Sequence, residues 1–376
     1  MSYTCDDVAE KVAEGLGFSC HDRNPFVSLR SPFDLENATM PFLELLVIGG
    51  AIWALVHSWR RWRREGDPIG IALWFASLVY LAVVEPPLYF PAWFGLEEHV
   101  GFIFSHNVFT VQFMYDRLPL YIVAFYPAIT TLSWEIVRSL RVLERRGAVA
   151  AAFAVAFVCQ VFYEIFDQLG PQLKWWAWNT DNRLINQPAL DSVPMNSMLL
   201  FASVSFAAMA WLVIRLVGPR DGRPVLGGGQ VAWRTVVAGV LTPFAMMIVS
   251  APTSAFRGDD QIGVQRTILW LELAVVWAVG IWLLVDAWRA SRDGYDEPVA
   301  SPTFARVYPA LFLAVHVVLW ATALPAYFAA TDGITEDGTP VGSLWYAVAC
   351  TLASGALIAA VLRATTRRPA LEPVKA

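Results

Sequence analysis

Residues 148–170 read AVAAAFAVAFVCQVFYEIFDQLG, an apolar run that ends in two acidic residues. A helix needs about 20 apolar residues to span the roughly 30 Å hydrocarbon core of a bilayer, so this run predicts a transmembrane helix. Gln160, Glu164 and Asp167 follow one another at spacings of four and three, which places them on one helix face. The run therefore predicts a membrane fold and a polar site at one end of a span.

Similar apolar runs recur along all 376 residues, of which 57% are hydrophobic and only 16% charged. The mean hydropathy of +0.49 is typical of a membrane protein. We therefore expect an all-α fold, a polytopic helical bundle that occupies residues 41–363. Its nine predicted spans are residues 41–58, 69–88, 118–140, 147–169, 197–217, 231–251, 267–288, 305–329 and 343–363.

The distribution of basic residues predicts the orientation of these spans. Arginines cluster after the first, third, fifth, seventh and ninth spans, whereas the other connections are richer in acidic residues. By the positive-inside rule, the amino terminus lies outside and the carboxyl terminus in the cytoplasm. We expect an extracytoplasmic arm (residues 1–40), two long outer loops (89–117 and 170–196) and a disordered cytoplasmic tail (364–376). The Ala/Val/Trp/Arg-rich composition and short loops favour a bacterial inner membrane.

Several functional classes find no support in the sequence. The net charge of -5 is small and unclustered, which argues against a nucleic-acid partner. The four cysteines and five histidines lack metal-ligand spacings, and no phosphate-binding Gly-rich loop or Gly-x-Ser-x-Gly elbow is present, so we expect neither a metal nor a cofactor. Cys5 and Cys20, both in the outer arm, are either a disulfide or two free thiols.

Five acidic residues fall within apolar runs, all in the predicted outer half of the membrane: Glu44, Glu85, Glu164, Asp167 and Glu272. A carboxylate at membrane depth costs at least about 2.5–3.5 kcal/mol, so several at one level predict partners or a shared wet cavity. Glu44 and Glu272 lie close enough to their span ends to reach the interface, which is the structural alternative for these two.

Three other polar side chains in or next to spans have simpler explanations. Glu135 has Arg138 one helical turn away, which predicts a local ion pair. Arg117 begins a span from the outside, where it either neutralises a buried carboxylate, binds an anionic group of a ligand, or snorkels to the interface. His316 lies in the middle of the eighth span, where a hydrogen bond between helices is as plausible as proton transfer.

The loop 170–196 is the candidate substrate-binding region. Aromatic faces stabilise cations, and a buried carboxyl group can protonate an alkene, an epoxide or an allylic alcohol. Together these groups favour carbocation chemistry on an apolar substrate from the bilayer. We expect Glu164, Asp167 and Glu85 to be catalytic, and the binding residues to be Gln160, Tyr163, Trp175, Trp176, Trp178, Asn179, Asp181, Arg183, Asn196 and Arg117.

A succession of motifs in this region resembles the membrane-embedded carotenoid hydratases. The residues concerned are Tyr163-Glu164, Gly170, Trp176-Ala-Trp178 and Val193-Pro-Met-Asn196, about forty positions in all. The same region is more distantly similar to the multi-span membrane terpene cyclases. This resemblance implies that Glu164 and Asp167 match the acid, that Trp176 and Trp178 match the loop aromatics, and that Asn196 matches the amide at the start of the next helix. Nine spans and an amino-terminal arm exceed what either family predicts.

The leading hypothesis is an integral membrane enzyme that hydrates or cyclises an isoprenoid or another lipid by acid-base chemistry in the outer half of the bilayer. A proton- or cation-coupled transporter or channel would use the same carboxylates, and kinks at prolines such as Pro127 and Pro325 suit both. A structural or lipid-binding membrane subunit is the third alternative. The sequence does not predict the oligomeric state.

Overall fold

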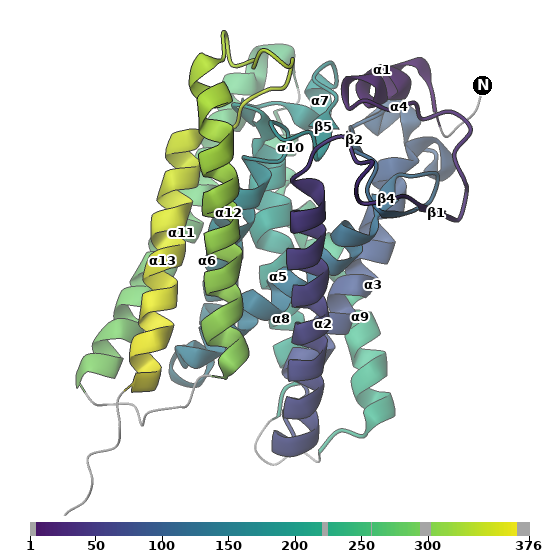
Figure 1. Cartoon of the computed structure of the whole chain (residues 1–376). Coiled ribbons are helices and arrows are strands. Elements are labelled where there is room, and N and C mark those ends of the chain that lie inside the picture. Colours follow the sequence, from purple (N-terminus) through teal and green to yellow (C-terminus); the bar gives the residue numbers. More distant parts are fainter. Residues whose placement is uncertain (1–4, 220–224, 257, 294–301, 367–376) are drawn as a thin grey trace, which may run out of the picture.

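The computed structural model describes residues 5–219, 225–256, 258–293 and 302–366. Long helices form a bundle, and short helices and strands form a cap over one end of it (Figure 1). Nine helical segments within the described residues are long and apolar enough to cross a membrane, as predicted, so the architecture is that of a multi-pass membrane protein. Most of the predicted tail, from residue 367 onward, lies outside the described residues.

The observed spans agree closely with the predicted ones. The largest differences are in α11, which is five residues longer than predicted at each end, in α2, which continues as a helix through the arginine-rich segment, and in α6, which begins earlier and is broken at Gly147 (φ 79°). The spans are α2 (Met40–Glu65), α3 (Ile69–Tyr89), α5 (Leu120–Ser139), α6 (Val142–Asp167), the π-helix η2 (Ser197–Val204) continued by α8 (Ser205–Leu216), α9 (Gly228–Val249), α11 (Ile262–Asp293), α12 (Thr303–Ala329) and α13 (Leu344–Thr366).

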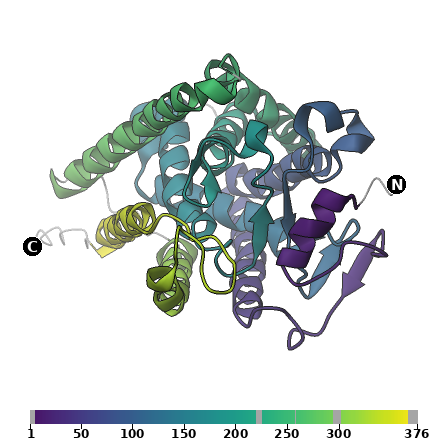
Figure 2. The same ribbon diagram turned by 90° about the horizontal axis from the view of Figure 1, so that it is seen from above.

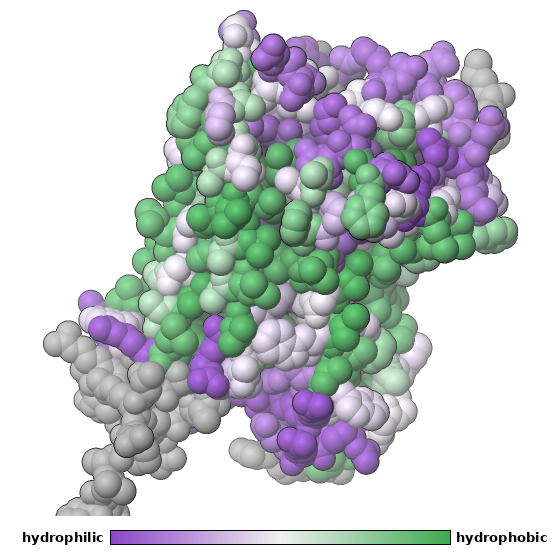
Figure 3. Space-filling view, viewed as in Figure 1, coloured by the Kyte–Doolittle hydropathy of each residue, from purple (hydrophilic) through white to green (hydrophobic). Residues whose placement is uncertain are grey.

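The helices α5 and α6 form the centre of the bundle. In their most apolar segments, 89% and 78% of the residues are buried inside the protein, against 28% for α11 and 33% for α9 and α13. The outer helices therefore turn much of their apolar surface outward. Figure 3 shows the resulting band of hydrophobic residues between two hydrophilic ends. A band of this kind matches the hydrocarbon layer of a membrane.

The cap is built from the arm and the two long loops, which pack at the same end of the bundle (Figures 1 and 2). The described residues form three small antiparallel sheets, β1-β3-β4, β2-β5 and β6-β7. The pairs β1-β3 and β2-β5 join segments that are distant in sequence, whereas β3-β4 and β6-β7 are local hairpins. These strands, of two or three residues each, were not predicted. The cap elements are α1 (Asp7–Gly15), β1 (Val27–Leu29), η1 (Pro91–Phe94), α4 (Glu97–Val100), β2 (Phe104–His106), β3 (Val111–Phe113), β4 (Leu118–Pro119), β5 (Trp176–Trp178), α7 (Arg183–Asn186), β6 (Ala189–Leu190) and β7 (Val193–Pro194).

A disulfide closes the arm on itself, and ion pairs hold the arm onto the loop 89–117. Cys5 and Cys20 form a disulfide, which resolves the alternative that the sequence left open. The carboxylate of the buried Asp116 lies 2.5 Å from Nη2 of Arg30 and 3.5 Å from Nη1 of Arg23. The arm is therefore an ordered part of the cap.

We expect the Cys5→Ser/Cys20→Ser variant to have a less stable cap. A disulfide that closes a loop of about 15 residues is worth roughly 3 kcal/mol in the chain-entropy account, and these two cysteines are 15 residues apart. The apparent melting temperature should fall, and trypsin should cleave the arm at Lys11 faster. The wild type treated with a reducing agent is the control and should behave like the variant. Unchanged melting and cleavage in both samples would contradict this role for the disulfide.

Candidate functional site

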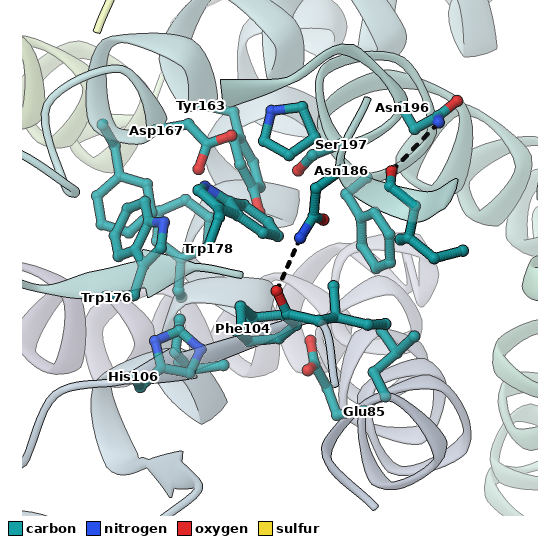
Figure 4. A pocket seen from close by; sticks show the side chains of 18 of the residues that line it. Glu85, Phe104, His106, Tyr163, Asp167, Trp176, Trp178, Asn186, Asn196 and Ser197 are labelled. Carbon is teal, nitrogen blue, oxygen red and sulfur yellow. Dashed lines mark hydrogen bonds between the residues drawn. The ribbon is translucent and has the colours of Figure 1, made fainter. Parts of the chain in front are cut away.

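A cavity of about 100 Å³ lies where the cap meets the bundle. Its walls come from the ends of α3 and α6, from one face of α5, from the paired strands β2 and β5, and from α7 and the start of η2 (Figure 4). Elements from both long loops and from four spans therefore converge on one small space. Its surface is mainly apolar, with a few polar side chains, as in most small-molecule sites.

Two carboxyl groups line this cavity. Asp167 is the last residue of α6, and Glu85 lies in α3 just before Pro86. Their relative exposures are only 3% and 4%, and in Figure 4 they lie on opposite sides of the cavity. The Tyr126 hydroxyl on α5 donates a hydrogen bond to Oε1 of Glu85. Among the described residues, the lining contains no Lys or Arg that would neutralise these acids.

Aromatic rings form the wall between the two acids. The β2-β5 ladder places Phe104 opposite Trp178 and His106 opposite Trp176. The ring centroids of these pairs are 5.2 Å and 6.1 Å apart, and Trp176 also lies 4.8 Å from Phe166 on α6. The pairing of the two loops thus builds an aromatic surface beside the carboxyl groups.

His106 is a neutral member of this wall. Its ring is buried, and Nδ1 lies 3.1 Å from the hydroxyl of Tyr121. Burial lowers the pKa of His106 to about 3, because the apolar surroundings disfavour the imidazolium. The side chain therefore has no charge at neutral pH, and it presents one hydrogen-bond donor and one acceptor.

The buried His106 should make the protein less stable in mild acid. In the unfolded chain a histidine takes up a proton below about pH 6.5, whereas the folded protein resists protonation down to about pH 3, so stability falls as the pH drops through that window. Between pH 7.5 and pH 5, His106 should lower the free energy of unfolding by about 2 kcal/mol. We expect His106→Gln to lose less of its apparent melting temperature over that range than the wild type. The exposed His99→Gln serves as control, and equal pH dependence in all three proteins would refute the prediction.

Several polar atoms around the cavity lack a protein partner. Within the described residues, Oε2 of Glu85, Oδ2 of Asp167 and Oδ1 of Asn186 are buried without a hydrogen bond. The same is true of Nε1 of Trp176 and Nε1 of Trp178. Buried polar groups rarely remain unpaired, and five such groups in the lining of one cavity indicate a ligand with its own polar atoms, or ordered water.

Close packing against Trp176 explains why residue 170 is a glycine. A Cβ atom at this position would lie 2.0 Å from Cη2 of Trp176, far inside van der Waals contact. Any larger residue would displace the indole that forms one wall of the cavity. Glycine here allows Trp176 to pack directly on the end of α6.

The structure brings together about half of the predicted site residues. Glu85, Asp167, Tyr163, Trp176, Trp178 and Asn196 all line the cavity. Trp175 does not line it, because its indole is buried against Phe166 and donates from Nε1 to Oγ1 of Thr39 (3.0 Å). Trp175 thus supports the aromatic wall from behind.

Glu164 and Gln160 belong to a second polar cluster, which faces α13. Nε2 of Gln168 donates to Oε2 of Glu164 (3.0 Å), and Nε2 of Gln160 donates to the hydroxyl of Tyr346 (3.0 Å). The hydroxyl of Ser203 donates to Oε1 of Gln160. Glu164 and Asp167 are thus on neighbouring sides of α6, and only Asp167 lines the cavity.

Side-chain amides hold the loop 170–196 onto the loop 89–117. Nδ2 of Asn179 donates to the carbonyl oxygen of Phe102, and Nδ2 of Asn186 donates to that of Ile103, each over 2.8 Å. Asp181 and Arg183 are exposed on the outer surface of the cap, away from the cavity. Of the polar loop residues named from the sequence, Asn179 therefore fixes the loop, and Asn196 lines the cavity.

Arg117 lies outside the cavity lining and contacts other residues of the cap. It is buried, Nη1 donates to Oγ of Ser105 (3.4 Å), and the guanidinium lies 5.2 Å from the ring centroid of Phe102. Burial lowers the pKa of Arg117 to about 10, so the side chain stays charged at neutral pH.

The remaining polar residues of the spans also lie outside the cavity lining. Glu44 accepts hydrogen bonds from the backbone N–H (3.1 Å) and the hydroxyl (2.7 Å) of Thr110. These contacts agree with a structural role for Glu44 at the end of its span. Nδ1 of His316 lies 2.9 Å from the carbonyl oxygen of Phe312 in the preceding turn. Glu272 is half-buried on α11. Of the five acids expected to share a cavity, the structure places Glu85 and Asp167 there.

Sequence reasoning missed four polar lining residues: Tyr126, His106, Asn186 and Ser197. Tyr126 had a usable signal, because Ile122, Phe125 and Tyr126 follow the three- and four-residue spacing of one helix face. The other three lie in or next to the long loops, where only the strand pairings and loop contacts determine their positions.

Comparisons with known proteins identify no relative. No family model matches the chain, and it matches no curated protein and no solved structure.

Proposed function

We propose that this protein is an integral membrane enzyme that uses carboxyl groups to protonate an isoprenoid or another unsaturated lipid, leading to hydration or cyclisation. The observation that carries the proposal is that Glu85 and Asp167 line one aromatic cavity at the level where cap and bundle meet. Each has a buried oxygen atom without a protein partner. The resemblance of the same region to the carotenoid hydratases supports this reading.

The two acids have distinct roles in this proposal. Burying a neutral carboxyl group costs much less than burying a carboxylate, and no cation lines the described cavity, so at least one acid enters the reaction with its proton. Asp167 donates that proton to an alkene carbon, which forms a C–H bond and leaves a carbocation. Trp176 and Trp178 stabilise the cation through their ring faces. Glu85 then accepts a proton, either from the attacking water or from a neighbouring carbon.

The cavity suits the reacting end of a lipid rather than a whole molecule. Its volume of about 100 Å³ is below the roughly 300–1,000 Å³ of sites that enclose a drug-sized ligand. Partly exposed apolar side chains at its boundary include Leu88, Ile185 and Phe201. The rest of a long substrate would therefore extend along the membrane-facing surface. In the proposed orientation the cap is extracytoplasmic, the carboxyl terminus is cytoplasmic, and the membrane is the inner membrane of a bacterium.

Mass spectrometry of co-purifying lipids tests this proposal. We would purify the wild type, Asp167→Asn and Glu85→Gln in a mild detergent and identify the bound lipids. An isoprenoid enriched over bulk lipid, and shifted toward the unreacted form in both variants, is the expected result. Only bulk phospholipid in all three samples would contradict a lipid-modifying enzyme.

One observation favours the transporter alternative. The buried cluster of Gln160, Glu164, Ser203 and Tyr346 continues the line of polar groups inward from Asp167. Such a line is what a proton or cation pathway requires. Ion flux in liposomes that is lost in both Asp167→Asn and Gln160→Leu would favour this alternative over the enzyme.

A further inference from the structure

A second hollow lies at the opposite end of the bundle from the cap, between α2, α3 and α9. This groove has a volume of about 460 Å³, and nearly all of its lining is aromatic or aliphatic, with Trp59, Trp62 and Phe75 as the largest side chains. Its single hydroxyl, on Thr235, donates to the carbonyl oxygen of Val231 in its own helix (2.8 Å). A groove with so few polar atoms accepts a hydrocarbon chain.

Basic side chains surround the end of α2 at this groove. Arg63 follows Trp59 by four residues, so it lies on the same helix face one turn nearer the end. Arg60, Arg63 and Arg64 are exposed, and the ion pairs of the described residues leave all three without a carboxylate. Arg61 differs, because it pairs with Glu65 and Asp67 (N···O 2.9 Å each). Arg63 therefore offers a positive charge on the groove side of α2, and Arg60 and Arg64 add positive charge on the other faces of the same helix end.

The beginning of α9 adds a second attraction for negative charge at the same place. Gly228, the first residue of this 22-residue helix, is part of the groove lining. The first turn of a helix carries backbone N–H groups without intrahelical partners and the positive end of the helix dipole. Gly228 and Gly229 have no side chains to cover these N–H groups. An anionic group above the groove would meet both Arg63 and the helix terminus.

We infer that this groove binds an anionic phospholipid, with an acyl chain along Trp59, Trp62 and Phe75 and the phosphate between Arg63 and the start of α9. The volume lies within the roughly 300–1,000 Å³ of small-ligand sites. This site is separate from the cavity at the cap and does not depend on the proposed function. It also fits the arginine-rich side that is predicted to face the cytoplasm, where anionic lipids attract basic segments.

Native mass spectrometry with competing lipids tests this inference. The purified full chain would be mixed with equal amounts of phosphatidylglycerol and phosphatidylcholine that carry identical acyl chains. We expect at least about fivefold enrichment of bound phosphatidylglycerol, since each nearby arginine contributes attraction of that order. The enrichment should fall toward onefold in Arg60→Gln/Arg63→Gln/Arg64→Gln.

Replacing alanine by phenylalanine at two positions tests the contribution of the groove separately from that of the arginines. Ala232→Phe fills the groove and should reduce the binding of phosphatidylglycerol at least about fivefold. Ala274→Phe, at an exposed position of α11, is the matched control and should bind the lipid like the wild type. Equal binding of the two lipids, enrichment that survives the loss of the arginines, or full binding by Ala232→Phe would each overturn the site.

Discussion

Replacing Asp167 by Asn should reduce product formation by about 10²- to 10⁴-fold, the range that a positioned acid or base contributes to a reaction. Asn keeps the size of the side chain and its place at the end of α6 but removes the acidic proton. Asn fills the same buried space beside Trp176 and Ser197 in the cavity lining, so packing is preserved. The loss should therefore appear in turnover and not in the melting temperature. The measurement is conversion of the co-purified lipid by the variant in liposomes.

Glu164→Gln provides the matched control for this prediction. Glu164 is one turn away on the same helix and equally buried, but it lies outside the cavity lining and accepts a hydrogen bond from Gln168. We expect this variant to retain much more activity than Asp167→Asn. The reverse order would assign the acid to Glu164, the other residue that the sequence resemblance matches to the acid, and would show that the cavity is not the reaction site.

Replacing Arg138 by Met should destabilise the bundle by about 3–5 kcal/mol, the usual cost of leaving one member of a buried ion pair alone. The Glu135–Arg138 pair predicted from the sequence is present: Nη2 of Arg138 lies 2.6 Å from Oε2 of Glu135, and both side chains are buried in α5. Nε2 of His57 lies 3.3 Å from the same carboxylate oxygen. The measurement is unfolding of the purified protein by a denaturing detergent, followed by circular dichroism.

An exposed ion pair in the same protein controls for the loss of a positive charge. Arg146 and Asp286 are separated by 2.5 Å between Nη2 and Oδ1, but the Arg146 side chain is substantially exposed. Arg146→Met should leave stability nearly unchanged, because solvent screens such pairs. The double variant Glu135→Met/Arg138→Met should recover part of the loss. If Arg138→Met were as stable as the wild type, the buried pair would not contribute to holding α5 in place.

The spans could be predicted because length and hydropathy are local properties of the sequence. Each predicted span overlaps an observed helix, and the differences in α2 and α6 have local causes. The segment after residue 58 stays helical beyond the apolar part of α2, where charged side chains reach solvent. Gly147 adopts a positive φ that separates the first turn of α6 from the rest. Neither feature changes the hydrophobic pattern from which the span was recognised.

The candidate site was only partly predictable, because its walls depend on contacts between distant segments. The strands β2 and β5 have three residues each, too few for a period-two pattern, yet their pairing brings His106 next to Trp176. The helix spacing correctly placed Glu164 and Asp167 near each other. Which of them lines the cavity depends on where α13 and η2 pack around α6, and spacing along one helix contains no such information.

Deuterium incorporation distinguishes protonation of a lipid by Asp167 from proton transport. The wild type and Asp167→Asn, each with the co-purified lipid in liposomes, would be incubated in D2O and the lipid analysed by mass spectrometry. Protonation of an alkene carbon by an exchangeable carboxyl group predicts a lipid product with a carbon-bound deuterium in the wild type and almost none in Asp167→Asn. A lipid without deuterium, in a protein that moves protons across the liposome membrane in a manner dependent on Asp167, would contradict the enzyme and support a transporter.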